Sequence, residues 1–102
     1  MNRILIIDNN LDKINNLKSF LAKQHMFYDL ARNNSELSPL ISKFVYSMII
    51  IFLDSDFKDR LETAIDLRNK LSTAVITIAE NLNSKKICDL INNNVTFIRM
   101  AR

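Results

Sequence analysis

The sequence predicts an α/β fold: a five-stranded parallel sheet in the strand order 2-1-3-4-5, with helices on its faces. Two observations lead to this prediction. Short runs rich in Ile, Val and Leu alternate with segments of helical periodicity, giving five strands and four helices in strict alternation. The strongest runs are apolar throughout, which is typical of strands buried on both faces of a parallel sheet. The chain has 102 residues and no linker or repeat, so we expect one domain over residues 1–102.

Residues 4–7 and 11–24 predict a strand followed by a helix. The run of Ile, Leu, Ile and Ile at positions 4–7 ends at Asp8, as expected for a short buried strand. Between residues 11 and 24, the spacing of the apolar residues changes to that of one helix face. The apolar residues on this face are Ile14, Leu17, Phe20 and Leu21.

A weaker strand and a short second helix come next. Residues 26–31 are the strand candidate, and the run from Asn33 to Ser35 predicts a turn after it. Ser38 is a preferred N-cap residue, and Pro39 has the fixed φ and the missing N–H that suit the first helical position. We therefore expect the second helix to begin at this Ser-Pro pair.

The second half of the chain repeats the alternation. Residues 48–53 form the most apolar run and predict the strongest strand. Apolar residues at helical spacing between positions 61 and 71 mark a third helix, and residues 74–79 predict a fourth strand. Residues 83–84 are suited to cap a fourth helix, which an asparagine run ends, and residues 95–100 predict the fifth strand.

The composition excludes several classes of enzyme. Without glycine the chain has neither a G-x-G-x-x-G motif nor a P-loop, because both need a backbone that approaches phosphate closely. Cys88 and His25 are the only Cys and His, too few for a structural zinc site and without the pattern of a nucleophile beside its base. We therefore expect no enzymatic activity and no bound cofactor.

The sequence also lacks the usual signals of membrane insertion or export. No apolar stretch approaches the roughly 18 residues that a membrane helix needs, and the first eight residues are too short and too soon charged for a signal peptide. A single Cys forms no internal disulfide, which is typical of the reducing cytoplasm. We expect a cytoplasmic protein without a membrane partner.

Polar residues follow several of the predicted strands. Asp8 and Asn9 come directly after the first strand, and Asp54, Ser55 and Asp56 follow the third. In open α/β sheets, ligands bind beyond the carboxyl ends of the strands, and carboxylates at that edge suit Mg²⁺. The alternative for Asp8 is that it caps the helix or turn that follows.

The strand that ends in Asp8, the order of the elements and their spacing resemble the receiver domains of bacterial response regulators over nearly the whole chain. The resemblance implies a flavodoxin-like (CheY-like) fold and a role in signal transduction. In that family a histidine kinase phosphorylates an Asp at the end of the third strand, and acidic residues after the first strand help to hold Mg²⁺. A Thr or Ser after the fourth strand and a Lys after the fifth sense the phosphate.

Laid along this pattern, without gaps from Ala31 onward, the sequence lacks most of the family's site. Asp8 takes the first acidic position, but the neutral Asn9 takes the second. The acceptor position falls on Phe52, the hydroxyl position on Ile78 and the lysine position on Met100. The resemblance therefore implies a degenerate phosphorylation pocket. We expect a pseudo-receiver that acts in signal transduction or transcription regulation through phosphorylation-independent protein contacts.

A second alignment places Asp54 at the acceptor position. It requires a two-residue insertion before the third strand and a compensating deletion after it. The chain would then be a phospho-accepting receiver, with Asp54 as the acceptor, Asp8 as the main metal ligand and Mg²⁺ as the cofactor. A third alternative is a basic nucleic-acid-binding domain, because the net charge is +3. Its support is thin, since the basic residues are dispersed.

The end of the sequence suggests an interface. Receivers continue into a fifth helix after the last strand, whereas this sequence stops at Arg102 without one. We expect an uncovered apolar surface on the fourth helix and fifth strand that binds a partner protein or forms a homodimer. The candidate interface residues are Ile87, Leu90, Ile91 and Phe97. The alternative is a fragment of a longer regulator, with an attached DNA-binding domain, whose next segment covers this surface.

Overall fold

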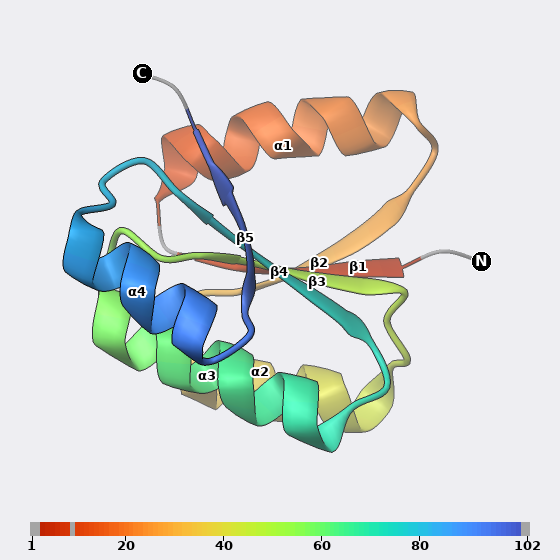
Figure 1. Ribbon diagram of the computed structural model, residues 1–102. Helices are drawn as coiled ribbons and strands as arrows, with labels where there is room; N and C mark the ends of the chain where they lie inside the picture. Colours follow the sequence, from red (N-terminus) through yellow and green to blue (C-terminus); the bar gives the residue numbers. More distant parts are fainter. Residues whose placement is uncertain (1–2, 9, 101–102) are drawn as a thin grey trace.

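The computed structural model describes residues 3–8 and 10–100, with the backbone alone for residue 11. Five parallel strands form one sheet in the order β2-β1-β3-β4-β5 (Figure 1). The strands are β1 (Arg3–Ile7), β2 (Phe27–Ala31), β3 (Met48–Phe52), β4 (Ala74–Ala79) and β5 (Thr96–Arg99). The helices are α1 (Leu11–Lys23), α2 (Asn34–Lys43), α3 (Phe57–Lys70) and α4 (Ser84–Asn92). The predicted fold class, element order and strand order are confirmed.

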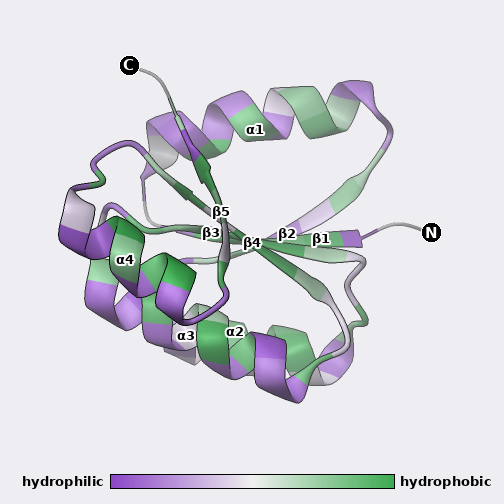
Figure 2. Ribbon diagram, viewed as in Figure 1, coloured by the Kyte–Doolittle hydropathy of each residue, from purple (hydrophilic) through white to green (hydrophobic). Residues whose placement is uncertain are grey.

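The helices cover the two faces of the sheet unequally. Figure 1 shows α1 alone on one face and α2, α3 and α4 together on the other. Successive strand residues point to opposite faces, so the apolar runs of β1 and β3 supply side chains to two separate cores. Figure 2 shows these apolar strands between the helix layers. The buried residues of the α1-side core are Ile4, Ile6, Ile14, Leu21, Ile50 and Phe52.

The α1 face of the sheet is incompletely covered near β5. Phe97 packs against the core on the α2–α4 side, so its neighbour Ile98 faces the other side of the strand. Ile98 is 50% exposed and Met100 is 38% exposed. Among the described residues, α1 is the only helix on this face. The strand β5 therefore presents apolar side chains to solvent on the face opposite the predicted Phe97.

The second helix begins earlier than predicted. It starts at Asn34, with Asn33 as its N-cap, and the Asn33 side chain accepts a hydrogen bond from the Glu36 N–H. The prediction that it begins at Ser38 is wrong, and Pro39 lies inside the helix. Asn33 is at least as good a cap as Ser, and the Glu36 carboxylate also accepts the N–H of the residue before the cap. These bonds start the helix before the proline is reached.

The fourth helix begins and ends as predicted. The Asn83 side chain is the N-cap and accepts a hydrogen bond from the Lys86 N–H at 2.8 Å. After the helix, Asn94 has a φ of 55°, the left-handed conformation that Asn tolerates better than most residues. No helix in the described part of the chain is long and apolar enough to cross a membrane.

Candidate functional site

The carboxyl ends of the parallel strands meet at one edge of the sheet and bring the predicted site residues together. Asp8 directly follows β1, and Phe52 is the last residue of β3. Phe52 pairs in register with Ile78 on β4. Asp54 lies two residues beyond β3, and Glu80 directly follows β4. This edge is therefore the candidate site.

An aromatic ring occupies the end of β3. Phe52 is only 3% exposed and belongs to the core between the sheet and α1. Ile78, its partner on β4, packs against the same core. Neither side chain offers an oxygen or a charge, so this part of the edge is closed by apolar contacts.

Asp54 is held by three donors. Its Oδ2 atom accepts a hydrogen bond from the Lys13 ammonium at 2.7 Å and from the Glu80 N–H at 2.9 Å. Its Oδ1 atom accepts the Asn81 N–H at 3.1 Å. The Lys13 and Asp54 side chains are 16% and 14% exposed, so water screens this ion pair only partly. The loop after β4 and the first turn of α1 are thus fastened to the loop after β3.

The pKa of Asp54 is lowered and the pKa of Lys13 is raised in this ion pair. Burial by itself raises the pKa of Asp54, but the hydrogen bonds from Lys13, Glu80 and Asn81 outweigh it and hold that pKa below its ordinary value. Burial likewise opposes the charged form of Lys13, yet its hydrogen bond to Asp54 raises the Lys13 pKa. The charges of Glu80 and Asp8 add to this increase. Both groups are therefore charged across the neutral pH range.

The position of Lys13 follows from the local structure. The helix α1 begins at the carboxyl end of β1, where the Asn10 side chain caps it by accepting the N–H groups of Asp12 and Lys13. Helical side chains lean toward the N-terminus, so a long side chain in the first turn reaches back over this edge. Sequence reasoning missed Lys13. The available signal in the sequence was the position of this lysine, three residues after Asn10, the last polar residue that follows the first predicted strand.

Asp8 is the most buried polar residue of the site. It is 1% exposed, and its Oδ1 atom accepts a hydrogen bond from the Ser55 hydroxyl at 3.0 Å. Within the described residues, its Oδ2 atom has no hydrogen-bond partner. The alternative that Asp8 caps the following helix is wrong, because Asn10 is the N-cap. Asn9, the other predicted residue of this loop, lies outside the described residues.

The described residues do not fit a Mg²⁺ site in this arrangement. Mg²⁺ needs several oxygen ligands in octahedral geometry. Asp8 offers one free oxygen, but both oxygens of Asp54 are already engaged, and Phe52 supplies none. Within the described part of the chain, no three His, Cys, Asp or Glu side chains come together as a metal site would require.

The candidate interface residues fall into different environments. Leu90 is fully buried in the core on the α2–α4 side, so the prediction that it lies on an exposed interface is wrong. Ile87 is partly buried, and Phe97 packs against the same core. Ile91 is 59% exposed, because one step along a helix turns the side chain by about 100°. Sequence reasoning missed the exposed Ile98 on β5.

Comparison with known proteins gives matches at the level of structure. No family model matches the sequence, and no curated protein matches it significantly. The structure superposes with a TM-score of 0.82 on a two-component response regulator from Clostridium difficile, at 22% identity over 100% of this chain and 85% of that one.

Two further receiver structures agree. The N-terminal domain of the nisin resistance regulator NsrR, a lantibiotic response regulator, has a TM-score of 0.79 at 16% identity, over 100% of this chain and 87% of that chain. The signal receiver domain of a DNA-binding response regulator from Colwellia psychrerythraea 34H has a TM-score of 0.79 at 17% identity, over 97% of this chain and 85% of that chain. The chain therefore has the CheY-like fold of response-regulator receiver domains.

Proposed function

We propose that the chain is an atypical receiver that acts in signal transduction, or transcription regulation, through phosphorylation-independent protein contacts. The fold supports the receiver part of this proposal. The observation that carries the second part is the ion pair between Lys13 and Asp54, with its 2.7 Å separation and its two supporting N–H groups. Asp54 is the only carboxylate within two residues of the end of β3, and the protein itself neutralises it.

A phosphoryl transfer to Asp54 would have to undo this arrangement. The attacking carboxylate oxygen would lose its hydrogen bond to Lys13 or to a backbone N–H. A hydrogen bond to a charged group contributes about 1.5–3 kcal/mol, and burial makes an unpaired group more costly. Neither Phe52 nor Ile78, which end β3 and face it on β4, carries a hydroxyl that could bind a phosphoryl group. We infer that the edge stays in one arrangement.

The second candidate is a phospho-accepting receiver with Asp54 as the acceptor. It is favoured by two facts: Asp54 lies at the expected edge, and the buried Asp8 keeps one carboxylate oxygen without a partner among the described residues. Nucleic-acid binding has no such support. Of the cations in the described part of the chain, Arg3, Lys13, Arg32 and Lys70 are engaged in ion pairs.

We propose that the apolar surface around β5 is where this receiver contacts a partner protein or a second copy of itself. Two exposed side chains support this surface, Ile98 on β5 and Met100 just after it, whereas the exposed Ile91 belongs to α4 on the opposite face of the sheet. Neighbouring exposed apolar side chains are characteristic of protein interfaces. Contacts of this kind are compatible with a cytoplasmic regulator that carries further domains.

A phosphorylation assay distinguishes the two candidate functions. The protein is incubated with acetyl phosphate and Mg²⁺, and the product is measured by intact mass, beside an Asp54→Asn variant. We expect no phosphorylated species and no change in the amide NMR spectrum with beryllofluoride. A phosphorylated species that disappears in Asp54→Asn but persists in the matched Asp56→Asn control would establish the phospho-accepting function instead.

A further inference from the structure

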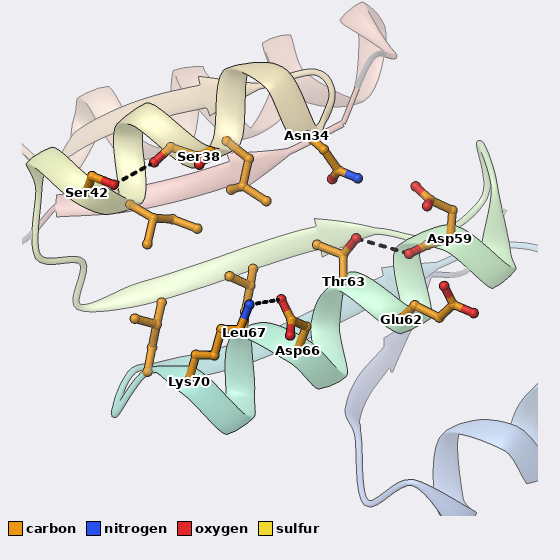
Figure 3. Close-up of a pocket in the computed structure, with 12 residues that line it drawn as sticks. Asn34, Ser38, Ser42, Asp59, Glu62, Thr63, Asp66, Leu67 and Lys70 are labelled. Atoms are coloured by element: carbon orange, nitrogen blue, oxygen red, sulfur yellow. Dashed lines mark hydrogen bonds and ion pairs between the residues drawn. The ribbon is translucent and has the colours of Figure 1, made fainter.

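A groove between α2 and α3 lies on the face of the sheet opposite α1 (Figures 1 and 3). Its volume is about 630 Å³. The α2 side contributes Asn34, Ser38 and Ser42, and the α3 side contributes the carboxylates. No function considered above uses this groove.

The floor of the groove is apolar. Leu37 and Leu67 are almost fully buried and belong to the core beneath it, at 7% and 4% exposure. Ile41 and Leu71 pack against that core but remain partly exposed to the groove. The floor therefore offers a narrow apolar strip between two helices, rather than the deep pocket that a small molecule needs.

The rim along α3 is acidic. Asp59, Glu62 and Asp66 are spaced by three and four residues, which places them on one side of the helix. Asp66 pairs with Lys70 at 3.0 Å. Among the described residues, Asp59 and Glu62 have no ion pair. The α2 rim across the groove carries only neutral serine and asparagine side chains (Figure 3).

This acidic rim stands out in a chain whose overall net charge is +3. An apolar strip beside unpaired carboxylates is complementary to a helix with an apolar face and a row of Lys or Arg. The flanking helices have 10 and 14 residues, or about 15 and 21 Å at 1.5 Å per residue. That length matches three to four turns of a docked helix.

We propose that the α2–α3 groove docks a basic amphipathic helix of a partner protein. The apolar residues of that helix lie on Ile41 and Leu71, which remain partly exposed, and its cations lie beside Asp59 and Glu62. The apolar contacts add to the affinity, and the carboxylates select basic over acidic helices.

The probe is a fluorescent leucine–lysine peptide of about four helical turns, with its leucines at positions i, i+3, i+4 and i+7. Its affinity is measured by anisotropy, and its site is mapped by amide chemical shifts. Glu62→Lys removes one rim charge and adds the opposite one. Asp12→Lys makes the same change in net charge on the exposed first turn of α1. We expect Glu62→Lys to weaken binding by about tenfold and Asp12→Lys by less than about twofold.

The Ser38→Lys variant is a second, independent test of the same groove. It places a cation on the opposite rim at an exposed helical position and touches no carboxylate. We expect it to weaken binding of the leucine–lysine peptide by about fivefold and to strengthen binding of a leucine–glutamate peptide. Equal losses in Glu62→Lys and Asp12→Lys, shifts that map outside α2 and α3, or no binding of the basic peptide would each overturn the proposal.

Discussion

Replacing Lys13 with Met tests whether the ion pair with Asp54 holds the strand-end site in one arrangement. Methionine keeps the length and much of the apolar stem of lysine but removes the ammonium. The change leaves a carboxylate at 14% exposure with only its two backbone donors. It therefore isolates the charge from the packing.

The structure sets the expected magnitude. A hydrogen bond between charged groups contributes about 1.5–3 kcal/mol, and loss of a partner in a buried pair costs about 3–5 kcal/mol. Because both side chains keep some contact with water, we take the lower part of this range. We expect Lys13→Met to lower the free energy of unfolding by about 2 kcal/mol, or about 10 °C in melting temperature.

The pH dependence gives a second signature. Because the folded state lowers the pKa of Asp54, its contribution to stability is complete above the ordinary value of 3.8 and is lost as the pH falls through the folded value. The folded state raises the pKa of Lys13, so that contribution is complete below 10.5 and is lost as the pH rises through the folded value. The stability difference between the wild type and Lys13→Met should therefore be largest between about pH 5 and 9.

The assay is urea unfolding at several pH values, with the pKa of Asp54 followed by carboxyl-carbon NMR. The matched control is Lys23→Met, since Lys23 is exposed in the last turn of the same helix and has no ion pair among the described residues. We expect the Asp54 pKa to rise in Lys13→Met, and a cycle with Asp54→Asn to show coupling of about 1 kcal/mol or more. If Lys13→Met unfolds like Lys23→Met, and the Asp54 pKa does not move, the proposed locking of the edge is wrong.

Three further predictions concern the cores and the β5 surface. Phe52→Asp places a carboxylate in the α1-side core at 3% exposure, so urea unfolding should show a loss of about 3–5 kcal/mol, without gain of phosphorylation. Tyr46→Phe removes a 2.8 Å hydrogen bond to Asp29 and should cost about 1–2 kcal/mol. Burial and Asp29 raise the Tyr46 pKa, so this loss should persist at pH 10 and shrink only at higher pH; an unchanged stability would contradict it. Ile98→Lys should reduce self-association in sedimentation velocity without lowering the melting temperature, whereas Phe20→Lys on exposed α1 should not; equal behaviour of the two variants would argue against the β5 surface.

The fold was predictable because its signals are local and agree with one another. The apolar runs of the strands and the helical spacing between them are visible in the sequence, and the asparagines around α4 mark both of its ends. The start of α2 was missed because two good caps compete within six residues. Asn33 prevails because Glu36 supports it with a second hydrogen bond, and sequence alone does not rank the two.

The site was only partly predictable, for a geometric reason. The strand ends identified Asp8, Phe52 and Asp54, because parallel strands place their carboxyl ends together. Lys13 joins them from a helix, and its reach depends on how α1 is set against the sheet, which no spacing rule gives. The rotation of α4 about its axis likewise decides that Leu90 is buried and Ile91 is exposed. The sequence shows that both residues are apolar but not which of them faces the sheet.

The position of Lys13 also bears on why this edge is stable at all. The carboxylates of Asp54, Glu80 and Asp8 each act on the Lys13 ammonium at this edge and help to raise its pKa. The Lys13 ammonium interacts favourably with all three carboxylates. In the phospho-accepting alternative a divalent cation would have this role, and it would bind and leave. Lys13 is part of the first turn of α1, so its positive charge stays at the site permanently. On the proposed function, the strand-end site is therefore fixed by the fold, and what changes during signalling is the occupancy of the exposed surfaces.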